Sequence, residues 1–147
     1  MSFQSRYTEI KNQLYGPFAY SGNQSLKDKG FDLKVKLLNE RYYLPAVALG
    51  LRDIAGTGFF SSEYLVATKS LGNLDISTGL GFGVLGLDNN INNPFTVISD
   101  HFGTSRTAYS GGGGEFSYGN WFSGPAALFG GVEYNLRKYK LKLIAEY

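Results

Sequence analysis

The chain has 147 residues, which suits one domain built around a single hydrophobic core. Its 20 Gly, 11 Tyr and 11 Phe favour strands and turns, and the absence of Cys excludes a disulfide framework, a thiolate metal site and a cysteine nucleophile. The formal net charge is only +2 and the basic residues are scattered, which argues against a nucleic-acid partner, and no run of about 18 apolar residues predicts a membrane helix.

The first 29 residues carry no clear period, and we expect residues 1–29 to form an irregular N-terminal segment. Leu14, Tyr15, Phe18 and Tyr20 suggest one more apolar strand within it, whereas the polar composition of residues 21–30 predicts a loop. The opening letters MSFQSRYTEIKN also lack the apolar core of a secretory signal.

Alternation of apolar with polar or small residues begins at Gly30 and predicts antiparallel strands over residues 30–38, 41–52, 59–69 and 73–85. Asn39-Glu40 and Leu71-Gly72 are the expected tight connections, and a glycine loop lies at 54–58. Pro45 has no N–H for a ladder, so we expect the second of these strands to be irregular there.

A long connection runs from Gly86 to Gly124, with an expected loop at 87–120 that contains the only His, His101. Loops of this length are uncommon inside compact domains and are usually functional or mobile. Alternation returns at 126–136 and 141–147, on either side of a turn at Arg137 to Tyr139.

About six or seven strands with alternately short and long connections predict an all-β fold. We expect an antiparallel up-and-down meander that is part of an outer-membrane-type β-barrel, with residues 1–147 forming a single partial β-barrel domain. A soluble up-and-down barrel would share the alternation.

One motif invites a different interpretation. The letters GFGVLG, from Gly81 to Gly86, satisfy the dinucleotide pattern G-x-G-x-x-G, but they lie inside an expected strand and no helix pattern follows them. We therefore expect Gly79, Gly81 and Gly83 to line the inner wall of a curved sheet, where a missing Cβ lets strands coil tightly or lets another segment approach.

Polar residues on the strands are candidates for a barrel lumen, and no residue is assigned a catalytic, cofactor-binding or metal-binding role. The candidate lumen residues are Arg52, Asp53, Glu63, Lys69 and Glu133. We expect Glu63 and Glu133 to point inward and to pair with Arg52, Lys69 or Lys142.

Two catalytic readings of the polar residues are less well supported. Glu63 and Glu133 form a carboxylate pair of the glycosidase kind only if folding brings them to the right separation. Asp100, His101, Ser105 and Arg106 are too close together in a loop to be oriented as a hydrolytic triad requires.

Three stretches of the chain are distinctive: GLRDIAGTGFFSSEYLVATKSLGNLDISTGLGFGVLG, NPF at Asn93 to Phe95, and WFSGPAALFGGVEYN at Trp121 to Asn135. In this order they resemble segments of the YjbH-like proteins, a family of outer-membrane proteins associated with exopolysaccharide and capsule production in Gram-negative bacteria. The resemblance covers roughly Gly30 to Tyr147. It implies a β-barrel protein or lipoprotein of the outer membrane, encoded with small periplasmic partners, and no assigned catalytic residues.

Members of that family are several hundred residues long and carry a signal peptide. We therefore expect this chain to be a fragment of a longer reading frame or a truncated relative, whose missing strands come from the rest of a chain or from another copy. Closed membrane barrels start at about eight strands, so this piece alone is not expected to span a bilayer as a closed monomer.

The expected function is a non-enzymatic outer-membrane component of exopolysaccharide or capsule production or export, without a cofactor. Its expected partners are outer-membrane lipid, the polysaccharide and periplasmic proteins of the same system, and no nucleic acid. The alternative is a soluble β-barrel or sandwich that binds a carbohydrate or apolar ligand, with its apolar row buried and its lysines in water.

Overall fold

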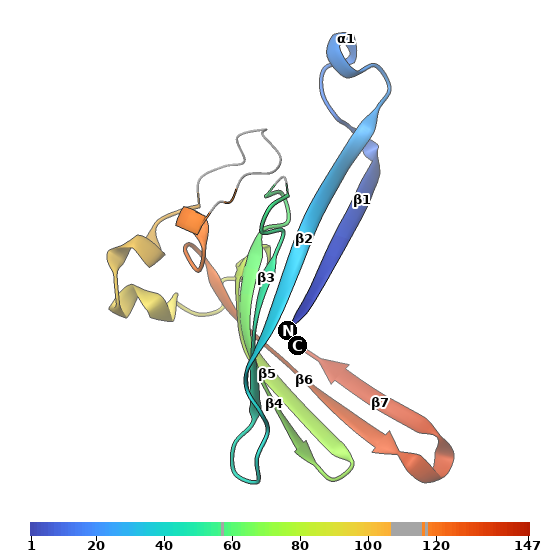
Figure 1. Cartoon of the computed structure of the whole chain (residues 1–147), viewed down its shortest axis with the longest axis vertical. Helices are drawn as coiled ribbons and strands as arrows, with labels where there is room; N and C mark the ends of the chain where they lie inside the picture. Colours follow the sequence, from blue (N-terminus) through green and yellow to red (C-terminus); the bar gives the residue numbers. More distant parts are fainter. Residues whose placement is uncertain (57, 107–115, 117) are drawn as a thin grey trace.

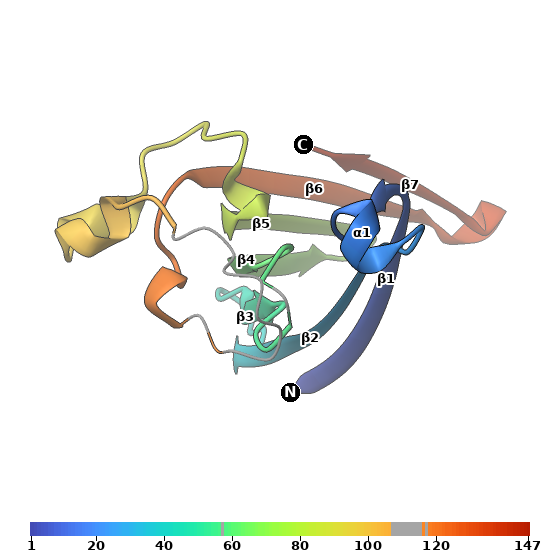
Figure 2. The ribbon, with the colours of Figure 1, turned by 90° about the horizontal axis from the view of Figure 1, so that it is seen from above.

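A computed structural model describes residues 1–56, 58–106, 116 and 118–147. Its seven strands form one sheet in the order β1-β2-β3-β4-β5-β6-β7, and every neighbouring pair is antiparallel. Figure 2 shows the sheet curled into a half-barrel. The predicted all-β meander is therefore confirmed.

The strands are β1 (Ser2–Leu14), β2 (Ser25–Leu38), β3 (Ala46–Arg52), β4 (Ser62–Leu71), β5 (Leu74–Gly83), β6 (Ala126–Leu136) and β7 (Leu141–Glu146). The helical elements are short: α1 (Phe18–Ser21) and the 3-10 turns η1 (Val84–Gly86), η2 (Pro94–Val97), η3 (Asp100–Gly103), η4 (Tyr118–Asn120) and η5 (Arg137–Tyr139). None of the described helices is long and apolar enough to cross a membrane.

The expectation of an irregular segment at 1–29 is wrong. Residues 2–14 form β1 and residues 25–29 begin β2, while Phe18 and Tyr20 belong to the helical turn α1 at the tip of this hairpin (Figure 1). The outer part of the hairpin extends beyond the other strands, so both of its faces meet solvent and neither requires apolar residues. Without one buried face there is no apolar alternation to detect.

The second predicted strand is shorter than expected at its start. The backbone groups of Arg41 and Leu44 bond to each other across a turn, and β3 begins at Ala46, directly after Pro45. Since Pro45 cannot donate to the ladder, the chain pairs only beyond it. By contrast, β4 and β5 are joined at the expected Leu71-Gly72 turn, where Gly72 has φ of +69°.

The two faces of the sheet differ in chemistry. On the convex face, cross-strand neighbours are mainly apolar, as in the row Val35, Leu49, Leu65, Leu80 and Leu128. On the concave face the neighbours are polar, aromatic or small, as in the row Lys34, Gly50, Tyr64, Gly81 and Ala127. Successive side chains on a strand point to opposite faces, so this division follows directly from the alternation.

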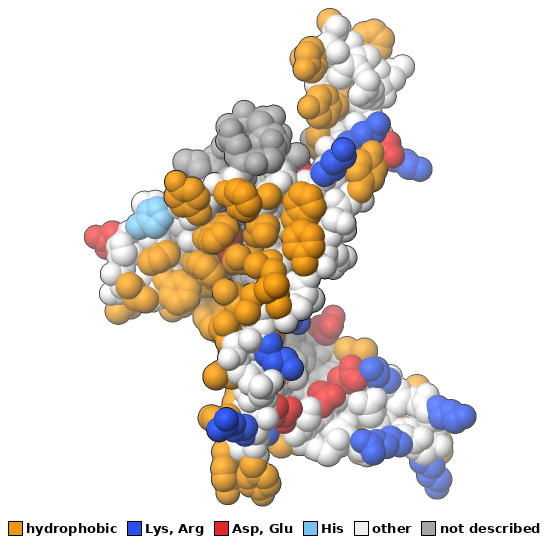
Figure 3. Space-filling model, viewed as in Figure 1, with side chains coloured by type: hydrophobic (Ala, Val, Ile, Leu, Met, Phe, Trp, Pro, Cys, Tyr) orange, Lys and Arg blue, Asp and Glu red, His pale blue; other side chains and the backbone are white. Residues whose placement is uncertain are grey.

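Little of the apolar convex face is covered by protein. Within the described residues, only Leu51, Phe82, Ala126 and Ala127 are buried apolar side chains. Large convex residues stand in solvent instead, among them Phe3, Ile76, Leu128, Val132, Tyr134 and Leu143. Figure 3 shows hydrophobic side chains gathered over the body of the sheet and the adjoining connection. The described part of the half-barrel therefore leaves most of its large apolar side chains at least partly exposed.

The connection between β5 and β6 folds over one end of the convex face. The ring of Phe82 stacks on Phe95 with centroids 5.4 Å apart and meets the edge of Phe122 at 5.5 Å. Asn90 exchanges hydrogen bonds with the backbone of Leu128, so the connection also pairs with the part of β6 that β7 does not reach. Residues 107–115 and 117 of the expected 87–120 loop lie outside the described residues.

Candidate functional site

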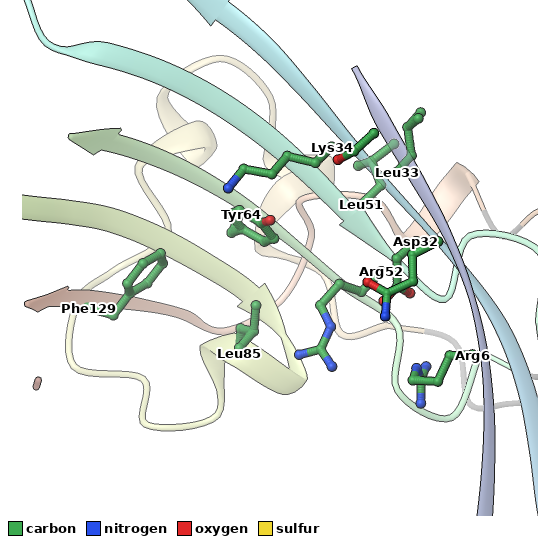
Figure 4. Close-up of a pocket in the computed structure, with 11 residues that line it drawn as sticks. Arg6, Asp32, Leu33, Lys34, Leu51, Arg52, Tyr64, Leu85 and Phe129 are labelled. Carbon is green, nitrogen blue, oxygen red and sulfur yellow. The ribbon is translucent and has the colours of Figure 1, made fainter. Parts of the chain in front are cut away.

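The concave face holds an open hollow of about 520 Å³ between β1, β2, β3 and β4 on one side and Leu85 and Phe129 on the other. Figure 4 shows Arg6, Asp32, Lys34, Arg52 and Tyr64 around this space. A second hollow of about 300 Å³ shares Ser2 and Lys34 with the first and adds Lys36 and Val66. The two hollows follow the same wall of the half-barrel.

Glycines on the concave face leave space for two aromatic side chains and for the turn η1, which line the first hollow. A Cβ on Gly50 would lie 2.1 Å from the ring of Tyr64, and a Cβ on Gly79 would lie 2.3 Å from the ring of Phe129. A Cβ on Gly81 would lie 2.8 Å from Leu85, where η1 folds onto the concave side. The expectation that missing Cβ atoms in this stretch let another segment approach is confirmed.

Three cations on the concave wall have no acidic partner in the part of the chain that the structure describes. Lys34, Lys36 and Arg52 make no ion pair or side-chain hydrogen bond with the described residues. Among the described residues, Asp32 is the only acidic residue that lines these two hollows, and its carboxylate accepts the backbone N–H of Asp53 at 3.0 Å. The wall therefore carries an excess of positive charge.

A buried charged cluster closes the end of this wall near the base of the β1–β2 extension. Arg6 lies 3.5 Å from Asp28, which is 2% exposed, and its guanidinium also lies over the ring of Phe60. Asp53 is buried beside them, with φ of +56°, and accepts the N–H of Phe60 at 3.1 Å. Gly30 and Gly56 leave the space that the Asp53 carboxylate occupies.

Burial raises the pKa of the Asp53 carboxyl above its ordinary value. The N–H of Phe60 and the charge of Arg6 oppose that shift, while Asp28 and Asp32 reinforce it. Within the described part of the chain, one oxygen of Asp53 and two nitrogens of Arg6 are buried without a hydrogen-bond partner. Deprotonation of Asp53 is therefore unfavourable in this cluster, because it places a negative charge in a buried site beside Asp28 and Asp32.

A second buried charged cluster lies on the opposite, convex face. The Glu63 side chain is 1% exposed. Its carboxylate accepts hydrogen bonds from two guanidinium nitrogens of Arg106 and from the N–H of Phe122, the last at 2.8 Å. Arg106 also donates to the carbonyl of Ser123 at 3.1 Å. These bonds join β4 to both ends of the stretch that contains the undescribed residues 107–115 and 117.

The five candidate lumen residues are therefore not brought together. Arg52 lines the concave hollow, Asp53 is buried at the end of β3, and Glu133 lines a further concave hollow of about 660 Å³ beside β7. Glu63 and Lys69 lie on the convex side, since they alternate with Tyr64 and Thr68.

The expected charge pairs are only partly found. Glu133 pairs with Lys142 at 2.7 Å, as expected. Glu63 pairs with Arg106 instead of with Arg52, Lys69 or Lys142, because the connection folds back onto β4. Lys69 pairs with Glu40 at 3.0 Å, across the turn that precedes β3.

The two catalytic readings find no support in this geometry. Glu63 and Glu133 point to opposite faces of the sheet, so they cannot flank one glycosidic bond. The His101 ring contacts the carbonyl of Gly119 at 2.9 Å, and Arg106 is engaged by Glu63. In the described part of the chain, no group of three or more His, Cys, Asp or Glu residues could hold a metal ion.

Sequence reasoning missed several of the residues that shape these sites. Arg6 and Asp28 lie in residues 1–29, for which the sequence predicts an irregular segment. Arg106 lies in the long connection, where no strand alternation indicates which way a side chain points. Lys34 and Lys36 were detectable, because they alternate with the apolar row of β2.

Comparison with known proteins gives two matches. Residues 1–147 match the model of a family described as "Exopolysaccharide biosynthesis protein YbjH". The chain is 46% identical over 143 residues to the "Uncharacterized lipoprotein YjbH" of Escherichia coli (strain K12); the match covers 97% of this chain and 20% of that protein. This chain thus spans about a fifth of that relative. No solved structure matches it significantly.

Proposed function

Because the chain belongs to the YjbH family of exopolysaccharide biosynthesis proteins, we propose that it is a non-enzymatic β-barrel component of the outer membrane that serves the production or export of an exopolysaccharide or capsule. The observation that carries the proposal is the division of the sheet into an exposed apolar convex face and a polar concave face. Outward apolar and inward polar side chains are the arrangement of outer-membrane barrels.

The proposed mechanism is passive. The convex face contacts outer-membrane lipid, while the concave face lines a polar passage along which the polysaccharide lies. Periplasmic proteins of the same system are the further partners that we propose, and no nucleic acid takes part. The long connection after β5 is held to the outside of the sheet by Glu63 and Arg106, so it contributes to one rim of the structure.

Closure of the barrel requires strands beyond these seven. In an antiparallel meander of seven strands, β1 and β7 run in the same direction. An all-antiparallel barrel therefore closes only if an odd number of further strands lies between them, and at least one is needed to reach eight. We propose that these strands come from the rest of a longer chain or from another copy, since an open edge in lipid leaves backbone groups unpaired.

The exposed apolar face also weighs against the alternative of a soluble carbohydrate-binding barrel or sandwich. Such a protein would bury the row that includes Ile76 and Leu80, yet Ile76 is 38% exposed and Leu80 is only half-buried.

Cell fractionation tests the proposed location and function. The protein should sediment with outer membranes, require detergent for extraction and migrate differently on gels before and after heating. Deleting its gene should lower the exopolysaccharide recovered from the culture medium, and restoring the gene should reverse this. Recovery of the protein in the soluble periplasmic fraction would refute the membrane-barrel proposal.

A further inference from the structure

We propose that the concave wall formed by β1, β2 and β3 binds an acidic polysaccharide, that is, a glycan whose sugars carry carboxylates. We call the wall lined by Lys34, Lys36, Arg52 and Tyr64 the basic groove. The inference rests on the proposed function in one respect, because it takes the ligand to be the polysaccharide that the system handles.

The positive charges of the basic groove are close together and outnumber the one acidic residue described in the same hollow, Asp32. Lys34 and Lys36 share one face of β2 and are therefore separated by about 7 Å along the strand, and Arg52 lies on the next strand. These three side chains have no acidic partner among the described residues. A concave surface concentrates the field of such charges, so it attracts a polyanion more strongly than scattered surface lysines do.

The opposite wall of the half-barrel has the opposite charge. Asp75, Glu133 and Glu146 line the hollow beside β7, and of these only Glu133 has an ion-pair partner within the described chain. An acidic polymer is therefore repelled from the β5–β7 wall and attracted to the β1–β3 wall. This asymmetry directs an anionic ligand along one side of the passage and disfavours a cationic ligand there.

Aromatic rings complete a surface suited to sugars rather than to small anions. Tyr64 lies over Gly50 and Phe129 lies over Gly79, with the two ring centroids 6.5 Å apart. Neither ring is fully buried, so both present carbon surface to the hollow. The C–H face of a pyranose packs on such rings while its carboxylate reaches the cations. A simple inorganic anion has no apolar surface that could pack on the rings.

A binding assay on the whole chain in detergent tests the proposal. The probe is a fluorescein-labelled oligogalacturonate, with labelled dextran of similar length as the neutral control. We expect the oligogalacturonate to bind, the dextran not to bind, and the affinity to fall as salt is raised, because exposed charges are screened.

A matched pair of triple variants separates the groove from net charge. Lys34→Gln/Lys36→Gln/Arg52→Gln should weaken binding by about tenfold or more, since three charge contacts are lost. Lys11→Gln/Lys138→Gln/Lys140→Gln removes the same charge from exposed positions outside the groove and should leave the affinity within about twofold of the parent. Equal losses in both variants, or equal binding of dextran, would overturn the proposal.

Vesicles distinguish a lipid headgroup from the glycan. If phosphatidylglycerol vesicles bind the parent chain and not Lys34→Gln/Lys36→Gln/Arg52→Gln, while the oligogalacturonate binds no better than dextran, the site is a lipid site and the proposal fails. The location test is independent: a periplasmic protein that still binds oligogalacturonate through the groove would refute the membrane barrel but not the basic groove. A membrane protein without this binding would refute only the groove.

Discussion

Glu63 and Arg106 form a buried ion pair that joins β4 to the connection before β6. Burying such a pair is costly unless its hydrogen bonds are complete, and here Phe122 and Ser123 supply further bonds. The pair thus acts as a latch whose main role is to hold the connection on the sheet. Removing one partner leaves the other buried without its counter-charge.

The first prediction follows from this latch. Arg106→Met should destabilise the docked connection by about 3 to 5 kcal/mol, the usual cost of leaving a buried charge unpaired. Trp121, the only Trp, is adjacent to Phe122, so its fluorescence should shift to the red and become more accessible to quenchers. Lys69→Met removes the more exposed pair with Glu40 and should cost about 0 to 1 kcal/mol. An unchanged Trp121 signal in Arg106→Met would contradict the latch.

Titration of Asp53 makes the stability of the folded chain depend on pH in one predictable direction. Because burial raises its pKa in the folded state, the folded chain retains this proton at pH values where the unfolded chain has lost it. The stability that it contributes is therefore complete below the ordinary carboxyl pKa and is lost as pH rises through the folded pKa. Asn tolerates the positive φ of this position and still accepts a hydrogen bond.

We therefore expect Asp53→Asn to gain stability relative to the parent as pH rises from about 3 to 7, measured as urea midpoints. Glu40 is the control of opposite sign, because its bonds to Lys69 and to the N–H of Ser70 lower its pKa. Glu40→Gln should lose stability relative to the parent at neutral pH, and this difference should vanish on acidification. A parallel pH trend in the two variants would contradict the assignment.

At the scale of the element, the end of β5 depends on one glycine. Gly83 has φ of +66°, and a Cβ there would lie 2.3 Å from the carbonyl of Ser61 and 2.7 Å from Arg106. This conformation lets the chain leave β5 and turn into η1, which places Leu85 over Gly81 on the concave side. The glycine thus positions residues on both faces of the sheet.

Gly83→Ala should lower the free energy of unfolding by about 1 to 3 kcal/mol, because it adds both backbone strain and a collision with backbone atoms. Gly119→Ala is the matched control, since a Cβ at Gly119 meets nothing within 4 Å and its φ is not positive. Urea unfolding of the two variants measures the difference. Equal midpoints would show that the turn after β5 tolerates a side chain.

At the scale of the whole molecule, the exposed convex face predicts where charge is tolerated. Leu80 lies in the middle of the apolar convex row, and Ser77 lies on the concave face of the same strand. In a membrane barrel, Arg at a lipid-facing position costs about 2 to 4 kcal/mol near the bilayer midplane, while a lumen position accepts it.

Leu80→Arg should therefore reduce the amount of protein assembled in the outer membrane, whereas Ser77→Arg should assemble at close to the parental level. Quantifying the heat-modifiable species in membrane fractions measures both. The reverse order, with Ser77→Arg the more damaging, would contradict the proposed orientation of the two faces.

Much of the architecture could be predicted from the sequence, but less of the candidate site. The alternation in β2, β4, β5 and β6 marks which residues share a face, because the pleat of a strand has a period of two wherever the strand pairs. The same alternation predicts that Lys34 and Lys36 share the face of β2 opposite its apolar row. It could not reveal β1, whose pairing with β2 continues past the edge of the curled sheet, where neither face is buried.

What the sequence determined by itself is local: the alternation that marks the strands from β2 onward, the position of turns such as Leu71-Gly72, and the separation of apolar from polar faces. The tertiary structure alone decided that Glu63 meets Arg106 and not Arg52, Lys69 or Lys142, and that Arg6 and Asp28 enclose Asp53. Those contacts join residues more than twenty positions apart in the chain. They depend on how far the sheet curls and on where the long connection folds back. The alternation of residues along the strands predicts neither of these.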